Sequence, residues 1–212
     1  MAYNKFTLKE VLQKFNLQIV DCADVVDKIK PYPPSEYLKT ALTLGMPKAL
    51  KINTEKARSE FIVAPVLLEI QQLLANKISL FSGTDFNVDK SKGLIGWCDF
   101  LISLDPSEET ILAPVISIVE AKKGDLKEGL GQCIAEMVAA QLFNQNEGNA
   151  IAVIYGAVTS GIHWKYLKLE GRSVFIEELE KSFTIADKNI DKLLGIFIKM
   201  LENQPITNSH TD

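Results

Sequence analysis

Three stretches rich in β-branched and aromatic residues, at 78–88, 94–104 and 111–122, follow one another with only short polar connections between them. Strands joined so closely pair antiparallel, because a parallel neighbour needs a crossover connection of a dozen or more residues. This part of the chain is therefore predicted to fold as an antiparallel meander of three strands.

The elements on either side of the meander extend it into a layered fold. An N-cap candidate at 53–55 begins a predicted helix that runs to about residue 76, and Pro65 inside it predicts a kink or local break. A second predicted helix covers 125–144, and the apolar run at 151–158 is typical of a strand buried on both faces.

A helix between the third and fourth strands indicates a parallel crossover. A hairpin around Gly171 and a last helix at 190–201 complete the order. The sequence therefore predicts an α/β protein with a mixed sheet flanked by helices.

The N-terminal quarter of the chain has a different pattern. Residues 1–50 hold too few apolar side chains for a core of their own, and the proline- and glycine-containing stretches 31–34 and 44–47 predict breaks. We expect this part to be a helical appendage packed on a core domain at 51–204. Residues 205–212 are expected to form a flexible tail.

Composition excludes several classes of protein. The 212 residues are 47% hydrophobic and 24% charged, which is ordinary for a globular domain and excludes a disordered chain. No apolar run approaches the roughly 18 residues of a membrane helix, and no signal peptide is visible, so we expect a cytoplasmic protein without a membrane partner. Three cysteines at unrelated spacings fit neither a disulfide framework nor a zinc cluster.

The charge of the chain limits its contact with nucleic acid. The net charge is −4, and Arg58 and Arg172 are the only arginines. Because arginine is the usual reader of guanine and a common phosphate clamp, extensive direct base readout is disfavoured. The net charge does not exclude a local basic groove that binds nucleic acid.

One group of charged residues stands at the ends of two neighbouring predicted strands. Glu120 and Lys122 are two residues apart, so they share a face of their strand, and Asp99 lies in the strand before. Charges at the end of a buried sheet are costly unless something compensates them. Two carboxylates are suitable ligands for Mg²⁺ or Mn²⁺, and a neighbouring lysine can stabilise charge that develops on a phosphate ester.

An aspartate followed by an E-x-K motif on the next strand, in this order of elements, resembles the PD-(D/E)XK nuclease superfamily. The branch it is most similar to contains the N-terminal nuclease domains of type I restriction subunits. The resemblance covers about residues 54–170 and implies a restriction-endonuclease-like αβββαβ core. The runs 54–60 and 131–137 are also similar to those of a group of cyanobacterial proteins of unassigned function.

The resemblance implies roles for individual residues. Asp99 and Glu120 would bind the metal directly, and Glu60 of the preceding helix would be a third ligand or act through water. Lys122 would position and polarise the attacking water, and Gln132 of the following helix would join the catalytic group.

The implied activity is Mg²⁺- or Mn²⁺-dependent hydrolysis of phosphodiester bonds in nucleic acid, with DNA expected as the partner ahead of RNA. Lys123 and Lys127 beside the motif are candidates for binding the nucleic-acid backbone, with a merely solvated face as the alternative. The sequence is compatible with either a monomer or a homodimer.

A second interpretation is a catalytically silent nuclease fold that serves as a binding or assembly module. The acidic net charge favours this interpretation, whereas the intact set of Asp99, Glu120 and Lys122 opposes it. Glu60 also fits an ordinary exposed helix position, and Gln132 and Glu136, one helical turn apart, also fit a brace for the sheet edge.

Overall fold

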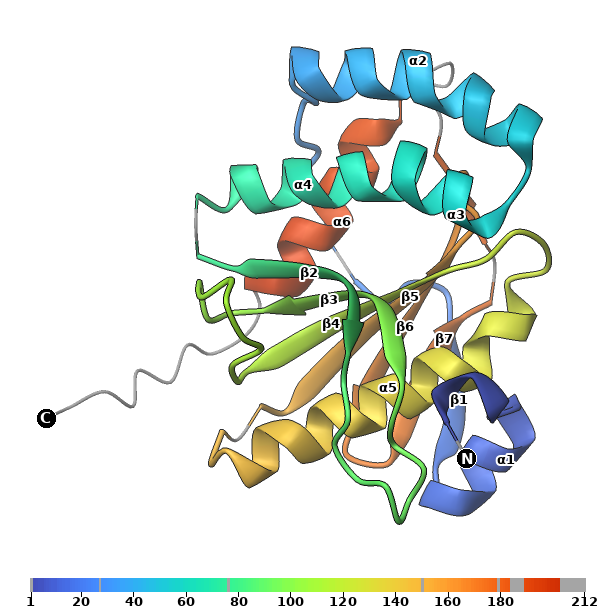
Figure 1. Cartoon of the computed structure of the whole chain (residues 1–212), viewed down its shortest axis with the longest axis vertical. Coiled ribbons are helices and arrows are strands. Elements are labelled where there is room, and N and C mark those ends of the chain that lie inside the picture. The colour runs from blue at the N-terminus through green and yellow to red at the C-terminus, as the bar shows by residue number, and fades with distance from the viewer. Residues whose placement is uncertain are drawn as a thin grey trace, which may run out of the picture.

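One mixed sheet runs through the molecule with helices on both of its faces (Figure 1). The structure is a computed structural model that describes residues 2–26, 28–75, 77–149, 151–178, 180–183 and 189–202, without the side chains of residues 117 and 118. The predicted tail at 205–212 lies outside these residues. Within them, no helix combines the length and apolar character needed to cross a membrane.

The sheet within the described residues has eight strands, in the order β1-β7-β6-β5-β4-β3-β2, with β8 paired to β6. The strands are β1 (Gln18–Cys22), β2 (Ser79–Asp85), β3 (Trp97–Ser103), β4 (Val115–Ala121), β5 (Val153–Thr159), β6 (His163–Glu170), β7 (Ser173–Glu177) and β8 (Lys181–Ser182). The helical elements are η1 (Tyr3–Lys5), α1 (Leu8–Phe15), α2 (Glu36–Ile52), α3 (Glu55–Arg58), the π-helical η2 (Ser59–Val63), α4 (Ala64–Leu73), α5 (Lys127–Asn146) and α6 (Ile190–Glu202).

The pairing of the strands confirms the predicted meander and crossover. Strands β2, β3 and β4 pair antiparallel in turn, β4 and β5 pair parallel across α5, and β5, β6 and β7 are again antiparallel. The α/β class with a mixed sheet flanked by helices is therefore confirmed.

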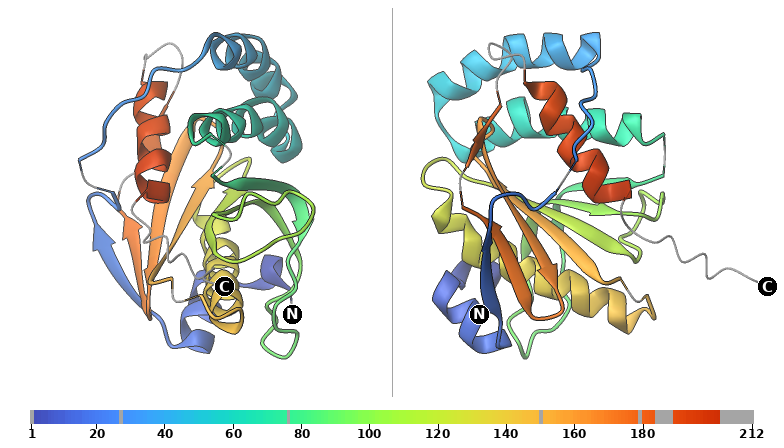
Figure 2. Two further views of the ribbon diagram at one scale, coloured as in Figure 1. Left: turned by 90° about the vertical axis from the view of Figure 1, so that its left-hand side faces the viewer. Right: turned by 180° about the vertical axis from the view of Figure 1, so that it is seen from behind.

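The helices form layers on the two faces of this sheet (Figures 1 and 2). Helix α5 covers β4 and β5 on one face, with η1 and α1 packed against it. On the other face α4 packs on β2, and α6 packs through Phe197 on the rings of Trp164 and Tyr166. Helix α2 lies outside α4 and η2 as a further layer.

Helix α5 is fixed on β4 by a buried asparagine. The Asn144 side chain donates to the Val115 carbonyl at 2.6 Å and accepts from the Val115 N–H at 2.7 Å. From Asn144 back to Gln132 the helix rises about 18 Å. The strand from Val115 to Glu120 spans about 17 Å. The helix and the strand thus run in opposite directions with matched lengths, so Gln132 lies over Glu120.

The N-terminal segment was predicted to be helical, but it also contains a strand. Residues 18–22 form β1, which pairs parallel with β7 at the edge of the sheet. This strand is mostly exposed and lacks a clear apolar alternation, and its partner lies about 150 residues away in sequence. Local pattern therefore could not reveal it.

The predicted break at 44–47 is wrong, because α2 continues through Pro47. Proline inside a helix costs about 3 kcal/mol. The helix nevertheless buries Leu38, Leu42 and Ala49 in the core. Gly45 also lets α2 approach η2 closely, since a Cβ atom there would lie 2.5 Å from the Phe61 carbonyl oxygen. Packing thus overrides the local preference.

The predicted helix start at 53–55 is confirmed, whereas at Pro65, where a kink or local break was predicted, the helical stretch continues and changes to a π-helical turn just before the proline. The Thr54 side chain caps α3 by accepting from the Ala57 N–H. The turn before Pro65 is π-helical, with the Ala64 N–H bonded to the Ser59 carbonyl. Proline has no N–H for the preceding turn, and a wider turn accommodates this loss.

Replacing Asn144 with leucine tests the anchor of α5. The Asn144→Leu variant should lose about 2–6 kcal/mol of unfolding free energy, since two buried backbone groups of Val115 lose their partners at about 1–3 kcal/mol each. Urea unfolding measures the loss. The control is Gln141→Leu, which removes a single partly exposed bond to Gly171 and should cost less than about 1 kcal/mol. Equal stability of the two variants would contradict the anchor.

Candidate functional site

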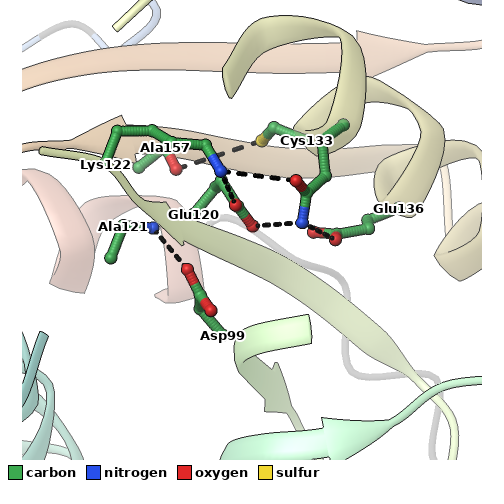
Figure 3. Close-up of polar contacts among 8 residues, drawn as sticks. Asp99, Glu120, Ala121, Lys122, Cys133, Glu136 and Ala157 are labelled. Carbon is green, nitrogen blue, oxygen red and sulfur yellow. Dashed lines mark hydrogen bonds and ion pairs between the residues drawn. The ribbon is translucent and has the colours of Figure 1, made fainter. Parts of the chain in front are cut away.

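A hydrogen-bonded group of charged side chains lies at the carboxyl end of β4, beneath the first turns of α5 (Figure 3). The Lys122 Nζ atom lies 2.5 Å from Glu120 Oε1, and Gln132 Nε2 donates to Glu120 Oε2 at 2.9 Å. Glu120 is only 1% exposed. Its two oxygens are therefore held by one strand neighbour and one helix residue.

Gln132 connects this pair to a second buried carboxyl group. Its Nε2 also donates to Glu136 Oε1 at 3.0 Å, and its Oε1 accepts from Lys122 Nζ at 3.4 Å. Glu136 is fully buried, and its Oε2 has no hydrogen-bond partner within the described residues. We call Glu120, Lys122, Gln132 and Glu136 the charged network.

Asp99 reaches the same strand end from β3. Its Oδ2 accepts a hydrogen bond of 2.8 Å from the backbone N–H of Ala121, the residue between Glu120 and Lys122 (Figure 3). The strand register leads to this arrangement, since Phe100 pairs with Val119 just before it. The two strands thereby bring Asp99 next to the charged network.

Gly129 allows α5 to lie so close to this end of the sheet. A Cβ atom at this position would lie 2.6 Å from Val158 Cγ1, closer than real side chains tolerate, and 3.1 Å from Lys122 Cγ. The glycine costs about 1 kcal/mol of helix propensity relative to alanine. In return, Gln132 on the next turn can reach Glu120.

Burial dominates the electrostatics of the carboxyl groups. It raises the pKa of Glu120 to about 8, with the Asp99 charge adding to the rise and Lys122 opposing it. Burial also raises the pKa of Glu136, and the Glu120 charge raises it further. The pKa of Asp99 is raised by burial as well, although the Ala121 N–H and Lys122 favour its ionised form.

Lys122 stays protonated in this setting. Burial lowers its pKa, but the charge and hydrogen bond of Glu120 outweigh burial, so the net shift is upward. One ammonium group thus faces the carboxyl groups of Asp99, Glu120 and Glu136. The site carries more acidic groups than its single cation can neutralise.

Not all of the site residues predicted from the sequence lie at the carboxyl end of β4. Asp99, Glu120, Lys122 and Gln132 are brought together, whereas Glu60 pairs with Lys56 at 2.8 Å and its side chain is half exposed.

The acid of this helical stretch that acts on the site is Glu55, whose charge affects the pKa values of Asp99, Glu120 and Lys122. Glu55 was visible in the sequence only as an acidic residue of a helix's first turn. The spacing to the E-x-K motif did not distinguish it from Glu60.

Lys123 and Lys127 are exposed beside the charged network, and Lys127 is the first residue of α5. Among the described residues, no three His, Cys, Asp or Glu side chains already converge as a metal site. Scans of the sequence against known protein families and against curated proteins find no match.

The titration of Glu136 predicts a pH-dependent stability. A carboxyl group whose folded-state pKa is raised favours folding below its unfolded pKa, near 4.5, and this contribution is lost as the pH rises toward the folded value. Glu136→Gln should therefore raise the free energy of unfolding above that of the wild type at pH 8 and change it little near pH 4.5.

Denaturant unfolding at several pH values measures this effect. The control is Glu128→Gln, which alters an exposed glutamate of the same helix and should keep the pH profile of the wild type. A Glu136→Gln variant whose stability follows the same pH profile as the wild type would contradict the assignment.

Proposed function

We propose that this protein hydrolyses phosphodiester bonds of nucleic acid with Mg²⁺ or Mn²⁺, at Asp99, Glu120 and Lys122. The observation that carries this proposal is the meeting of two acids and a lysine at one strand end, with a helix glutamine bonded to them. This is the donor set that the resemblance to PD-(D/E)XK nucleases implies for cleavage.

The oxygen donors fit a divalent cation. Each carboxylate oxygen can accept two hydrogen bonds or ligands, and each oxygen of Glu120 has one donor from the charged network. In the described part of the chain, the single hydrogen bond to the Asp99 carboxylate leaves its Oδ1 open. Asp99 and Glu120 would hold the ion, which supplies Lewis-acid stabilisation of phosphate charge when bound.

Lys122 has the properties of the group that orients water and stabilises charge. Its ammonium keeps its proton and offers three donors, of which one goes to Glu120 and a long one to Gln132. The side chain is 17% exposed, so solvent and substrate can reach it. The remaining donor would hold a water or a phosphate oxygen that gains negative charge during attack.

Gln132 and Glu136 are positioning residues in this scheme. The Gln132 amide uses both of its N–H groups, one on Glu120 and one on Glu136, and this fixes the Glu120 carboxylate. Lys123 and Lys127, exposed beside the network, would contact backbone phosphates of a nucleic acid.

A second candidate function is a catalytically silent binding module. The observation that favours it is that both Glu120 oxygens already accept from donors of the protein itself. In that case the charged network would only brace α5 on β4, and the ion would be unnecessary.

Cleavage assays with lysine variants decide between the two functions. With Mn²⁺ the wild type should nick plasmid DNA or cut single-stranded DNA or RNA, and EDTA should stop the reaction. Lys122→Met should lower the rate by about 10²–10³-fold, as is typical when one donor to the transition state is lost. The matched control is Lys168→Met, because Lys168 is similarly shielded but lies over the Phe175 ring.

Equal rates for Lys122→Met and wild type would contradict the role of Lys122. Absence of cleavage on all three substrates would favour the silent module.

A further inference from the structure

Lys165 on β6 is a buried lysine that pairs with no carboxylate in the described part of the chain. The residue is 7% exposed, and its Nζ donates to the backbone carbonyl of Glu178 at 3.1 Å. An ammonium group has three donors, so two remain for another partner. Because a buried charge without a counter-ion is costly, this position favours an anionic ligand.

A cavity of about 240 Å³ lies beside Lys165. Lys127 at the start of α5 also lines it, with Leu8, Leu130 and Ile176 as apolar walls. The cavity therefore combines one buried and one exposed ammonium group with apolar walls.

Acidic residues also border this cavity but leave the Lys165 charge unpaired. Asp21 and Glu178 are exposed, so water screens their charges. The Glu177 carboxylate is held through its Oε1 by Lys181 at 2.7 Å and by the Val25 N–H, and within the described residues its Oε2 has no hydrogen-bond partner.

The cavity is a close neighbour of the charged network. Glu120 pairs with Val158 on β5, and Val158 pairs with Lys165 on β6, so the three residues form one row across the sheet. Directly paired residues share a face, and two strand spacings amount to about 10 Å. Lys165 thus lies on the same face as Glu120, two strands away.

We infer that Lys165 and Lys127 form a subsite for a backbone phosphate of the nucleic acid. This phosphate would lie a few nucleotides from the phosphodiester bond that is hydrolysed at Asp99 and Glu120. A strand carries one phosphate per about 3.4 Å of helix axis, so phosphates of a single strand can occupy both positions. The choice of nucleic acid as the source of this phosphate rests on the proposed function, whereas the anion site itself rests on Lys165 and the cavity.

Phosphate titration in EDTA tests the subsite without any metal. Calorimetry should detect inorganic phosphate binding to the wild type, at least tenfold weaker binding to Lys165→Met, and unchanged binding to Lys168→Met. Lys168 is the matched control, because it lies three residues along the same strand with its ammonium over Phe175. Lys127→Met alters an exposed residue, so it should weaken phosphate binding even if Lys165→Met does not fold.

Competition identifies the source of the phosphate. A short single-stranded oligonucleotide should displace inorganic phosphate from the wild type and bind Lys165→Met more weakly. Phosphate binding that no oligonucleotide displaces would overturn the nucleic-acid assignment. Absent phosphate binding, or equal binding by all four proteins, would overturn the subsite.

These outcomes are independent of cleavage. The wild type could fail to cut any substrate while the Lys165→Met variant binds phosphate and oligonucleotide more weakly than the wild type does. In that case the subsite is supported and the proposed hydrolysis is not.

Discussion

The contact of α5 with β4 determines how Gln132 and Glu136 meet Glu120 and Lys122. Asn144 bonds both backbone groups of Val115 at one end, and Gln132 bonds Glu120 at the other. Gly129 permits the close approach between these elements. Because the helix and the strand have matched lengths between the two anchors, the Gln132 amide meets the Glu120 carboxylate without distortion of either element.

This docking buries more acidic groups than the site can neutralise. Burial raises the pKa of Glu120 to about 8, so a proton competes with any cation for this carboxylate near neutral pH. A divalent ion bound by Asp99 and Glu120 would release that proton, and its affinity should therefore rise with pH. The same imbalance that destabilises the folded protein thus favours binding of a cation.

Local pattern predicted the meander, α5 and the hairpin, because their apolar periodicity and turn residues agree with the tertiary fold. Strand β1 could not be predicted, since its partner β7 is distant in sequence. Spacing located Asp99, Glu120 and Lys122, but it did not separate Glu60, which pairs with Lys56, from Glu55, whose charge acts on the site. The burial of Lys165 was also not predictable from the sequence, because residues of α1, β1, α5 and β7, which are far apart in the chain, line the cavity beside it.

Anomalous diffraction from crystals soaked in Mn²⁺ tests the central claim most directly. We expect an anomalous peak at about 2.0–2.3 Å from carboxylate oxygens of both Asp99 and Glu120. Crystals of Asp99→Asn, soaked in the same way, should lack the peak. The metal site would be contradicted if wild-type crystals show no peak beside Glu120 and Lys122 and Gln132 still hold its carboxylate. The charged network would then serve only as a brace between α5 and β4.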